Sequence, residues 1–245
     1  MSVITYESRG QIAIITINRP EKKNSLTREM VGELNSAWIR FNDSDDRVAV
    51  LTGAGNDVFC AGADLDDIPH DLWRGIPGIG AAVEKPIIGA AAGWVVGGGL
   101  ALLQYTDLLI AAENCKFVYP EAKVGFSGGL IASMCTRVPH KIAMELLLLG
   151  EPIGAQRAYE VGFVNKIVPV GQQLDTALEW AAKLAANAPL VLTLLKSFVE
   201  QTLPKGPSEA AGIAKRQVDE VTYSSDMDEG LAAFKAKRAA DFQGV

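Results

Sequence analysis

Hydrophobic residues follow a period of two in some segments and of three to four in others, which predicts a mixed α/β fold. The segment "IAIITI" within residues 11–18 is rich in β-branched residues. Together with residues 4–7 it flanks the Ser-Arg-Gly turn at 8–10, so the chain is expected to begin with a β-hairpin.

A helical period begins after Thr27, which is a good N-cap residue. The apolar positions that recur there at steps of three and four are Met30, Leu34, Ala37, Trp38 and Phe41. The spacing predicts a helix with one buried face.

Continuous apolar runs predict buried strands at residues 47–53, 85–93 and 107–112, with a helix from Gly98. "KFVYPEAKVGF" at 116–126 is expected to be a short extended piece, and 163–169 a strand. Later patterns predict helices at 139–149, 155–161, 174–186, 190–202, 208–221 and 227–238. Strands alternating with helices, followed by helices alone, indicate one α/β core with a helical C-terminal part.

The composition is that of an ordinary globular protein of 245 residues, of which 49% are hydrophobic. No apolar stretch reaches the roughly 18 to 20 residues that cross a bilayer. Residues 1–10 lack a basic start followed by an apolar block. We therefore expect a cytoplasmic protein without a membrane partner.

Charge and residue usage exclude several function classes. The net charge is -6 and the pI is about 5.1, which argues against a nucleic-acid surface. The three cysteines lie far apart, without a CxxC pair, and only two histidines are present. These features favour neither disulfides, nor a metal site, nor a Ser-His-Asp triad.

Three glycines in a row, at 97–99 in "VVGGGLALL", lie between a strand-like segment and a helix. Free N–H groups collect at such a point, and glycine lets a ligand approach them. The triplet lacks the GxGxxG and GK[ST] spacings of nucleotide-binding loops, and tight helix–sheet packing is an alternative reason for it.

A second loop of the same kind occurs in "FCAGADLDD" at residues 59–67, where Gly62 precedes Ala63. The acidic residues Asp64, Asp66 and Asp67 are expected to start and cap a helix there. Two N–H groups from separate loops could converge on one carbonyl oxygen and stabilise its developing negative charge. The two loops together predict an oxyanion hole.

Six segments occur in the order and spacing of one family: "NRPEKKNSLT", "VLTGAGNDVFCAGADL", "KPIIGAAAGWVVGGGLAL", "FVYPEAKVGF", "AYEVGFVNKIVP" and "EGLAAFKAKR". The chain resembles the crotonase family, the enoyl-CoA hydratases and isomerases, over nearly its whole length. The resemblance implies a β-β-α spiral core that binds acyl-CoA (residues 1–190) and a helical C-terminal trimerisation region (191–245). It also implies a homotrimer or a dimer of trimers.

The resemblance also assigns roles to residues. The thioester oxygen would lie between the N–H groups of Ala63 and Gly98. No cofactor is implied, because coenzyme A is part of the substrate. The CoA moiety would be contacted by Lys22 and Lys23 and by the backbones of Asp64 and Leu65. Phe234 and Lys237 would contact it from an adjacent subunit. The lysines can equally be solvated surface charges.

Two positions decide the expected reaction. A hydratase of this family uses two glutamates on one water. The position in the "PE" pair is Glu121, whereas the position two residues after the glycine triplet is Ala101. A single base suits a 1,3 proton shift, so double-bond isomerisation is expected. A hydratase, another acyl-CoA lyase or hydrolase, and a non-catalytic acyl-CoA-binding protein remain alternatives, and Glu121 can also be a loop acid or a helix cap.

Overall fold

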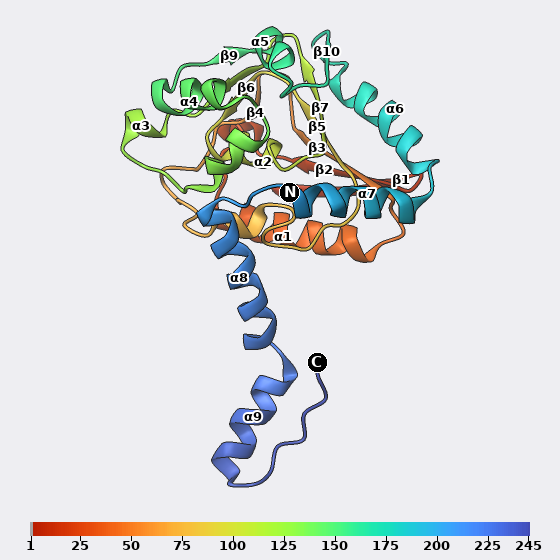
Figure 1. Ribbon diagram of the computed structural model, residues 1–245, viewed down its shortest axis with the longest axis vertical. Coiled ribbons are helices and arrows are strands. Elements are labelled where there is room, and N and C mark those ends of the chain that lie inside the picture. Colours follow the sequence, from red (N-terminus) through yellow and green to blue (C-terminus); the bar gives the residue numbers. More distant parts are fainter. Residues whose placement is uncertain (1) are drawn as a thin grey trace.

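The computed structural model describes residues 2–245 and has a mixed α/β architecture (Figure 1). The strands are β1 (Ile4–Arg9), β2 (Ile12–Ile17), β3 (Val48–Gly53), β4 (Val58–Cys60), β5 (Ile87–Ala91), β6 (Trp94–Val96), β7 (Leu108–Ala112), β8 (Lys116–Val118), β9 (Ile153–Gly154) and β10 (Lys166–Val168). The helices are α1 (Arg28–Asp43), α2 (Gly98–Leu103), α3 (Glu121–Val124), α4 (His140–Leu149), α5 (Ala155–Glu160), α6 (Gln173–Ala185), α7 (Pro189–Thr202), α8 (Pro207–Thr222) and α9 (Ser225–Ala236). Short 3-10 helices are η1 (Pro20–Lys22), η2 (Leu72–Gly75) and η3 (Leu130–Thr136).

The strands form two sheets that the chain visits in turn. One sheet has the order β1-β2-β3-β5-β7-β10 and the other the order β4-β6-β8-β9. From β3 to β8, each strand of the larger sheet is followed by one of the smaller sheet, and within each sheet these strands are parallel. The chain therefore forms a spiral in which each turn adds one strand to both sheets, as the expected β-β-α core requires.

Two hydrophobic clusters hold the layers together. The larger one includes fully buried Trp38 and Phe41 of α1 and Phe117 of β8. Burial of one such side chain contributes about 1.5–3 kcal/mol to folding. The second cluster lies between α6 and the larger sheet, where Ala177 and Ala181 pack with residues such as Val50. Small alanines on α6 let the helix lie close to the strands.

Most of the predicted elements are confirmed. The hairpin is β1–β2, and the Thr27 hydroxyl caps α1 by accepting the Met30 N–H at 3.2 Å. The extended piece predicted at 116–126 is wrong beyond Val118. There Glu121 begins a helical turn that ends at Gly125, whose φ of +71° a glycine adopts without strain.

The C-terminal helices project from the core. In Figure 1, α8 leaves the lower side of the molecule and α9 continues away from it. Residues after α9 return along that helix, where the Asp226 carboxylate accepts the N–H groups of Gln243 and Gly244 at 2.7 and 2.8 Å. The boundary predicted at 190/191 lies in the first turn of α7, and a trimerisation role for residues 191–245 stays a prediction.

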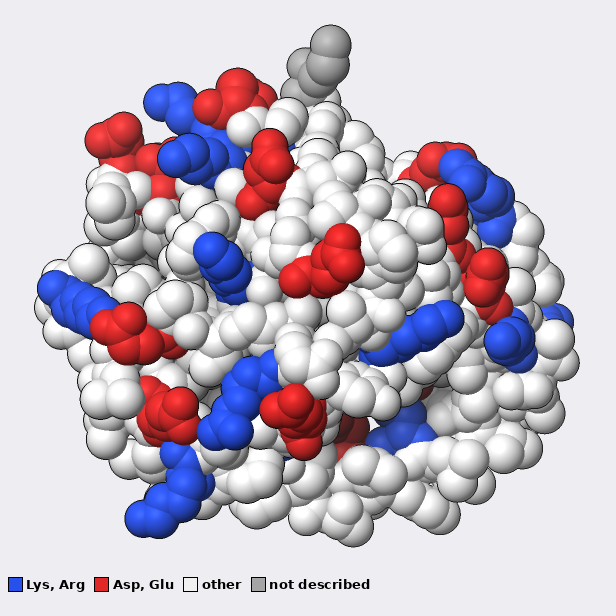
Figure 2. Space-filling view, turned by 90° about the horizontal axis from the view of Figure 1, so that it is seen from above, with Lys and Arg blue, Asp and Glu red and all other residues white. Residues whose placement is uncertain are grey.

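Surface charge is mixed on the face in Figure 2, where Lys and Arg are interspersed with Asp and Glu. Within residues 2–245, no single helix is long and apolar enough to cross a membrane. Only α6 and α7 counted together, across a bend of 107°, pass that test by length and composition.

Candidate active site

The three loops that carry the candidate site residues follow three neighbouring strands. β4, β6 and β8 are adjacent and parallel in the smaller sheet, so their carboxyl ends meet at one edge. Ala63 follows β4 by three residues, Gly98 follows β6 by two, and Glu121 follows β8 by three. Ligands commonly bind at this edge of parallel strands. The spiral thus brings together residues that are far apart in sequence.

A cavity of about 490 Å³ opens at that edge, a size typical of small-molecule sites. Its lining includes Gly62, Ala63, Gly97, Gly98, Ala101 and Glu121, together with apolar or aromatic residues such as Leu72, Trp73, Val96, Tyr119, Phe126, Leu130 and Ile131. A mostly apolar wall around one acid suits a ligand whose reacting part is uncharged.

The backbone N–H groups of Ala63 and Gly98 lie close together and donate no hydrogen bond within residues 2–245. A Cβ added to Gly98 would lie 3.9 Å from the Ala63 nitrogen. The backbone of Leu26 forms hydrogen bonds to the residues on either side of Ala63. Its N–H donates to the Gly62 carbonyl and its carbonyl accepts the Asp64 N–H, both at 2.8 Å, while the Ala63 N–H takes no part. Two free donors can therefore bind a single oxygen atom.

The three glycines of the triplet differ in how much room a side chain would have. A Cβ on Gly97 would lie 2.6 Å from Glu121 Oε1, and its φ of +50° also favours glycine. A Cβ on Gly98 would meet only the ends of Leu72 and Leu26, at 3.1 and 3.2 Å. A Cβ on Gly99 would lie 2.7 Å from Cys60 Cβ. Gly97 makes room for the acid, and Gly99 lets α2 approach β4.

Glu121 is 9% exposed, and its Oε2 is buried without a hydrogen-bond partner within residues 2–245. Burial raises the pKa of Glu121 from 4.5 to about 7, against a smaller opposing effect of its own backbone N–H. Desolvation disfavours the carboxylate more than the neutral acid. A pKa near neutrality lets one group both accept and donate a proton, as general acid–base chemistry requires.

For any reaction in which Glu121 removes a proton, the rate is expected to follow its ionisation. Because the pKa is raised to about 7, log(kcat/KM) should rise by about one per pH unit below that value and level off above it. The measurement is a pH profile between about 5 and 9. A profile that is already flat at about pH 5.5 would contradict the raised pKa, because it would match an ordinary glutamate.

No second carboxylate accompanies Glu121 among the residues lining the cavity. Ala101 lies in α2, is 3% exposed and lines the cavity. Asp67, His70 and Asp71 lie in the loop after Ala63, and of these three only His70 lines the cavity. Asp67 pairs with Arg28 at 3.1 Å, and Asp71 lies 4.0 Å from Arg74.

The acidic segment after Ala63 does not begin a helix, so that expectation is wrong. Asp64 instead pairs with Arg19 at 2.5 Å and accepts the Asp66 N–H at 3.0 Å. The hydrogen bond from Arg19 is the main reason why the pKa of Asp64 is lowered to about 2. This long-range ion pair fixes the loop as a turn, and Leu65 is left 82% exposed at the cavity rim.

The remaining predicted CoA contacts lie away from the cavity wall. Lys22 and Lys23 are exposed, and the Lys23 carbonyl accepts the Ala61 N–H at 3.1 Å, which ties their turn to the loop of Ala63. Phe234 is 84% exposed and Lys237 is exposed at the end of α9. Within one chain, α9 lies at the far end of the projecting helices (Figure 1), so these two residues do not join the cavity.

Several cavity residues had no strong signal in the sequence. Ser208, at the start of α8, lines the cavity and packs on Gly129. The Tyr119 hydroxyl lies 3.3 Å from the Ser127 hydroxyl, so the wall beside Glu121 is partly polar. Their part in the wall depends on contacts between elements, which periodicity cannot predict.

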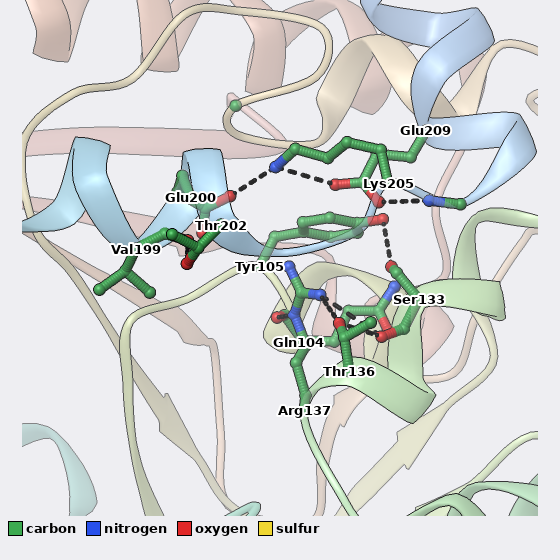
Figure 3. A network of polar contacts seen from close by, with 12 residues as sticks. Gln104, Tyr105, Ser133, Thr136, Arg137, Val199, Glu200, Thr202, Lys205 and Glu209 are labelled. Atoms are coloured by element: carbon green, nitrogen blue, oxygen red, sulfur yellow. Dashed lines mark hydrogen bonds and ion pairs between the residues drawn. The ribbon is translucent and has the colours of Figure 1, made fainter.

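A polar network supports the apolar wall formed by η3 (Figure 3). Gln104, at the end of α2, donates to the Leu130 carbonyl at 2.7 Å, and the Tyr105 hydroxyl lies 3.0 Å from that of Ser133. Lys205 pairs with Glu200 of α7 at 2.7 Å and lies 3.6 Å from Glu209 of α8. The network joins the end of α2, the helix that begins at Gly98, to η3, whose Leu130 and Ile131 line the cavity.

The spiral fold with this cavity defines the crotonase class of proteins, and comparisons with known proteins agree. The sequence model described as enoyl-CoA hydratase/isomerase matches residues 7–245. The chain belongs to this family, the crotonase family, and is an enzyme of the enoyl-CoA hydratase/isomerase type.

Individual relatives cover the chain almost completely. It is 38% identical to enoyl-CoA hydratase EchA19 of Mycobacterium tuberculosis, over 97% of this chain and 95% of the relative. It is 36% identical to (E)-benzylidenesuccinyl-CoA hydratase of Thauera aromatica, over 99% of each. Among solved structures, enoyl-CoA hydratase from Bacillus anthracis superposes with a TM-score of 0.78 at 29% identity, over 100% of both chains.

Proposed function

We propose that this enzyme moves a double bond in an enoyl-CoA thioester, with Glu121 as the only carboxylate that transfers the proton. The observation that carries the proposal is that one cavity is lined by buried Glu121 and by Ala101, which stands where a hydratase of this family has its second glutamate. Alanine has no proton to give, so Glu121 is the one carboxylate among the residues that line the cavity.

The proposed reaction needs one proton and one oxyanion site. Glu121 takes a proton from C2 of a 3-enoyl-CoA, and the electron pair of the broken C–H bond delocalises into the thioester, whose oxygen accepts the Ala63 and Gly98 N–H groups. The same carboxyl then returns the proton to C4. The double bond moves from C3–C4 to C2–C3, and no atom is gained or lost. Donors fixed in advance around the oxygen stabilise the dienolate.

We further propose that the CoA phosphates and adenine lie near Lys22 and Lys23, with backbone contacts from Asp64 and Leu65. Helix α9 projects away from the core (Figure 1), and neither Phe234 on it nor Lys237 directly after it lines the cavity, which supports a contribution to the CoA site of a neighbouring copy in a trimer. Gel filtration of the full chain tests the assembly.

The test is incubation with a 3-enoyl-CoA in heavy water, followed by mass spectrometry. Isomerisation predicts a trans-2-enoyl-CoA of unchanged heavy-atom composition, with deuterium wherever the shuttled proton exchanges with solvent. Addition of one water without migration would instead establish a hydratase. Hydration is the second candidate because EchA19 and the Thauera relative are both named hydratases.

Ala101→Glu is expected to add hydration to the enzyme. A carboxyl at position 101 would enter the cavity that Glu121 lines, and we expect a water to bind between the two acids. Formation of 3-hydroxyacyl-CoA from a trans-2-enoyl-CoA should rise by about tenfold or more, within the range that general acid–base groups contribute. Ala101→Gln is the matched control, since it has the same size and transfers no proton. Equal hydration by both variants would contradict the prediction.

A further inference from the structure

Cys60 is a buried thiol directly behind the two loops that provide the free amides. It ends β4, is fully buried, and does not line the cavity. Its Sγ accepts the Gly62 N–H at 3.4 Å. Gly62 has a φ of +88° and immediately precedes Ala63, so the thiol bonds the residue that sets the direction of the Ala63 amide.

The same side chain contacts the second loop. A Cβ on Gly99 would lie 2.7 Å from Cys60 Cβ and 3.1 Å from its Sγ, so the thiol packs directly against the first turn of α2. Gly99 immediately follows Gly98. One buried side chain therefore touches the residue before one free amide and the residue after the other.

We propose that Cys60 is a positioning residue that fixes the Ala63 and Gly98 N–H groups at the separation one thioester oxygen needs. The inference rests on the proposed function for the roles of those two amides. Oxyanion donors act within a narrow range of distance, about 2.7–3.1 Å from the oxygen. A loop held by only one contact would sample a wider range of distances between its N–H group and the oxygen.

The peptide that carries the Ala63 N–H is held from both sides in this arrangement. Its carbonyl, on Gly62, accepts the Leu26 N–H at 2.8 Å, and the preceding N–H is bound by Cys60 Sγ. The thiol also stays neutral, because burial raises the pKa of Cys60 to about 12. A neutral sulfur places no negative charge behind the enolate that forms in front of it.

The test compares Cys60→Ala, Cys60→Ser and the wild type with an acyl-CoA labelled with ¹³C at the thioester carbonyl. Difference infrared spectroscopy should show a lowered carbonyl stretch in the bound wild type. Cys60→Ala, which lacks an acceptor for Gly62, should lose at least half of that shift. It should also lower kcat by about tenfold, a fraction of what loss of a whole oxyanion donor costs, with KM within about twofold. Cys60→Ser keeps an acceptor and should retain most of the shift.

The matched control is Cys115→Ala, which also removes a buried thiol. Cys115 is 1% exposed, donates to the Ala91 carbonyl at 3.1 Å, and lies outside the cavity lining. It should keep the wild-type carbonyl shift even where it lowers the melting temperature.

Two results overturn the positioning role in different ways. In the first, the wild type shows the carbonyl shift and Cys60→Ala keeps it, or folded Cys60→Ser loses it as fully as Cys60→Ala does. Either result rules out the positioning role of Cys60 and leaves the oxyanion hole in place. Absence of any shift in the wild type overturns the oxyanion hole itself and the positioning role with it.

Discussion

Glu121→Gln is expected to lower kcat for double-bond migration by about 10² to 10⁴-fold while KM changes little. Gln has nearly the shape of Glu and fills the same space above Gly97, but it cannot accept a proton. The measurement is steady-state isomerisation at about pH 8, where the wild-type carboxyl is ionised. Retention of activity within about tenfold of wild type would remove Glu121 from the reaction.

The same variant has a stability signature that shows it is folded. Burial raises the pKa of Glu121 from 4.5 to about 7, so the folded state favours the protonated acid. The free energy of unfolding of the wild type therefore falls as pH rises from about 4.5 through about 7. Glu121→Gln lacks this loss. It should therefore be more stable than wild type at about pH 8, by roughly 1–3 kcal/mol, with a smaller difference at about pH 5. Denaturant unfolding at the two pH values measures it.

Gly98→Pro is expected to lower kcat by about 10² to 10³-fold, as removal of one oxyanion donor does. Gly98 is the first residue of α2, a position where proline fits because its N–H has no partner in the helix. The substitution therefore deletes one free amide and leaves the helix hydrogen bonds intact. Initial rates of isomerisation and of C2 deuterium exchange should fall together.

Gly98→Ala is the matched control, since it adds a Cβ at the same place and keeps the N–H. That Cβ meets only flexible ends of Leu72 and Leu26. It should retain activity to within about tenfold of wild type, well above the proline variant. Equal loss in both variants would assign the effect to steric crowding and contradict the role of the amide.

The sequence predicted the parts of the site that depend on local chemistry. Glycines before a helix and the "CAGAD" segment predicted two loops with free N–H groups, and the family resemblance assigned those groups to Gly98 and Ala63. The family resemblance pointed to Glu121 and to the gap at Ala101. The inference of the two loops used residue types within a few positions of one another, where local rules are strong, whereas the roles of single residues came from the resemblance.

The parts that failed depend on distant contacts. Asp64 looked like a helix cap, but Arg19, 45 positions away, holds it in a turn. Glu121 looked extended, yet its segment forms one helical turn, too short to show a period. The proposed role of Cys60 could not be inferred from the sequence, because it depends on the packing of Gly99 against this side chain. The three-residue strands β4, β6 and β8 also lack a readable alternation.

Each turn of the spiral contributes one functional group: Ala63 after β4, Gly98 after β6 and Glu121 after β8. The chemistry is thus modular. In the proposed reaction, the first two turns hold the thioester enolate and the third supplies the group that carries the proton. A change confined to the third loop, or to Ala101 in the lining of the same cavity, is expected to redirect the reaction without rebuilding the first two loops. If the proposed roles hold, single substitutions are expected to change the reaction type in this scaffold while recognition of the thioester stays the same.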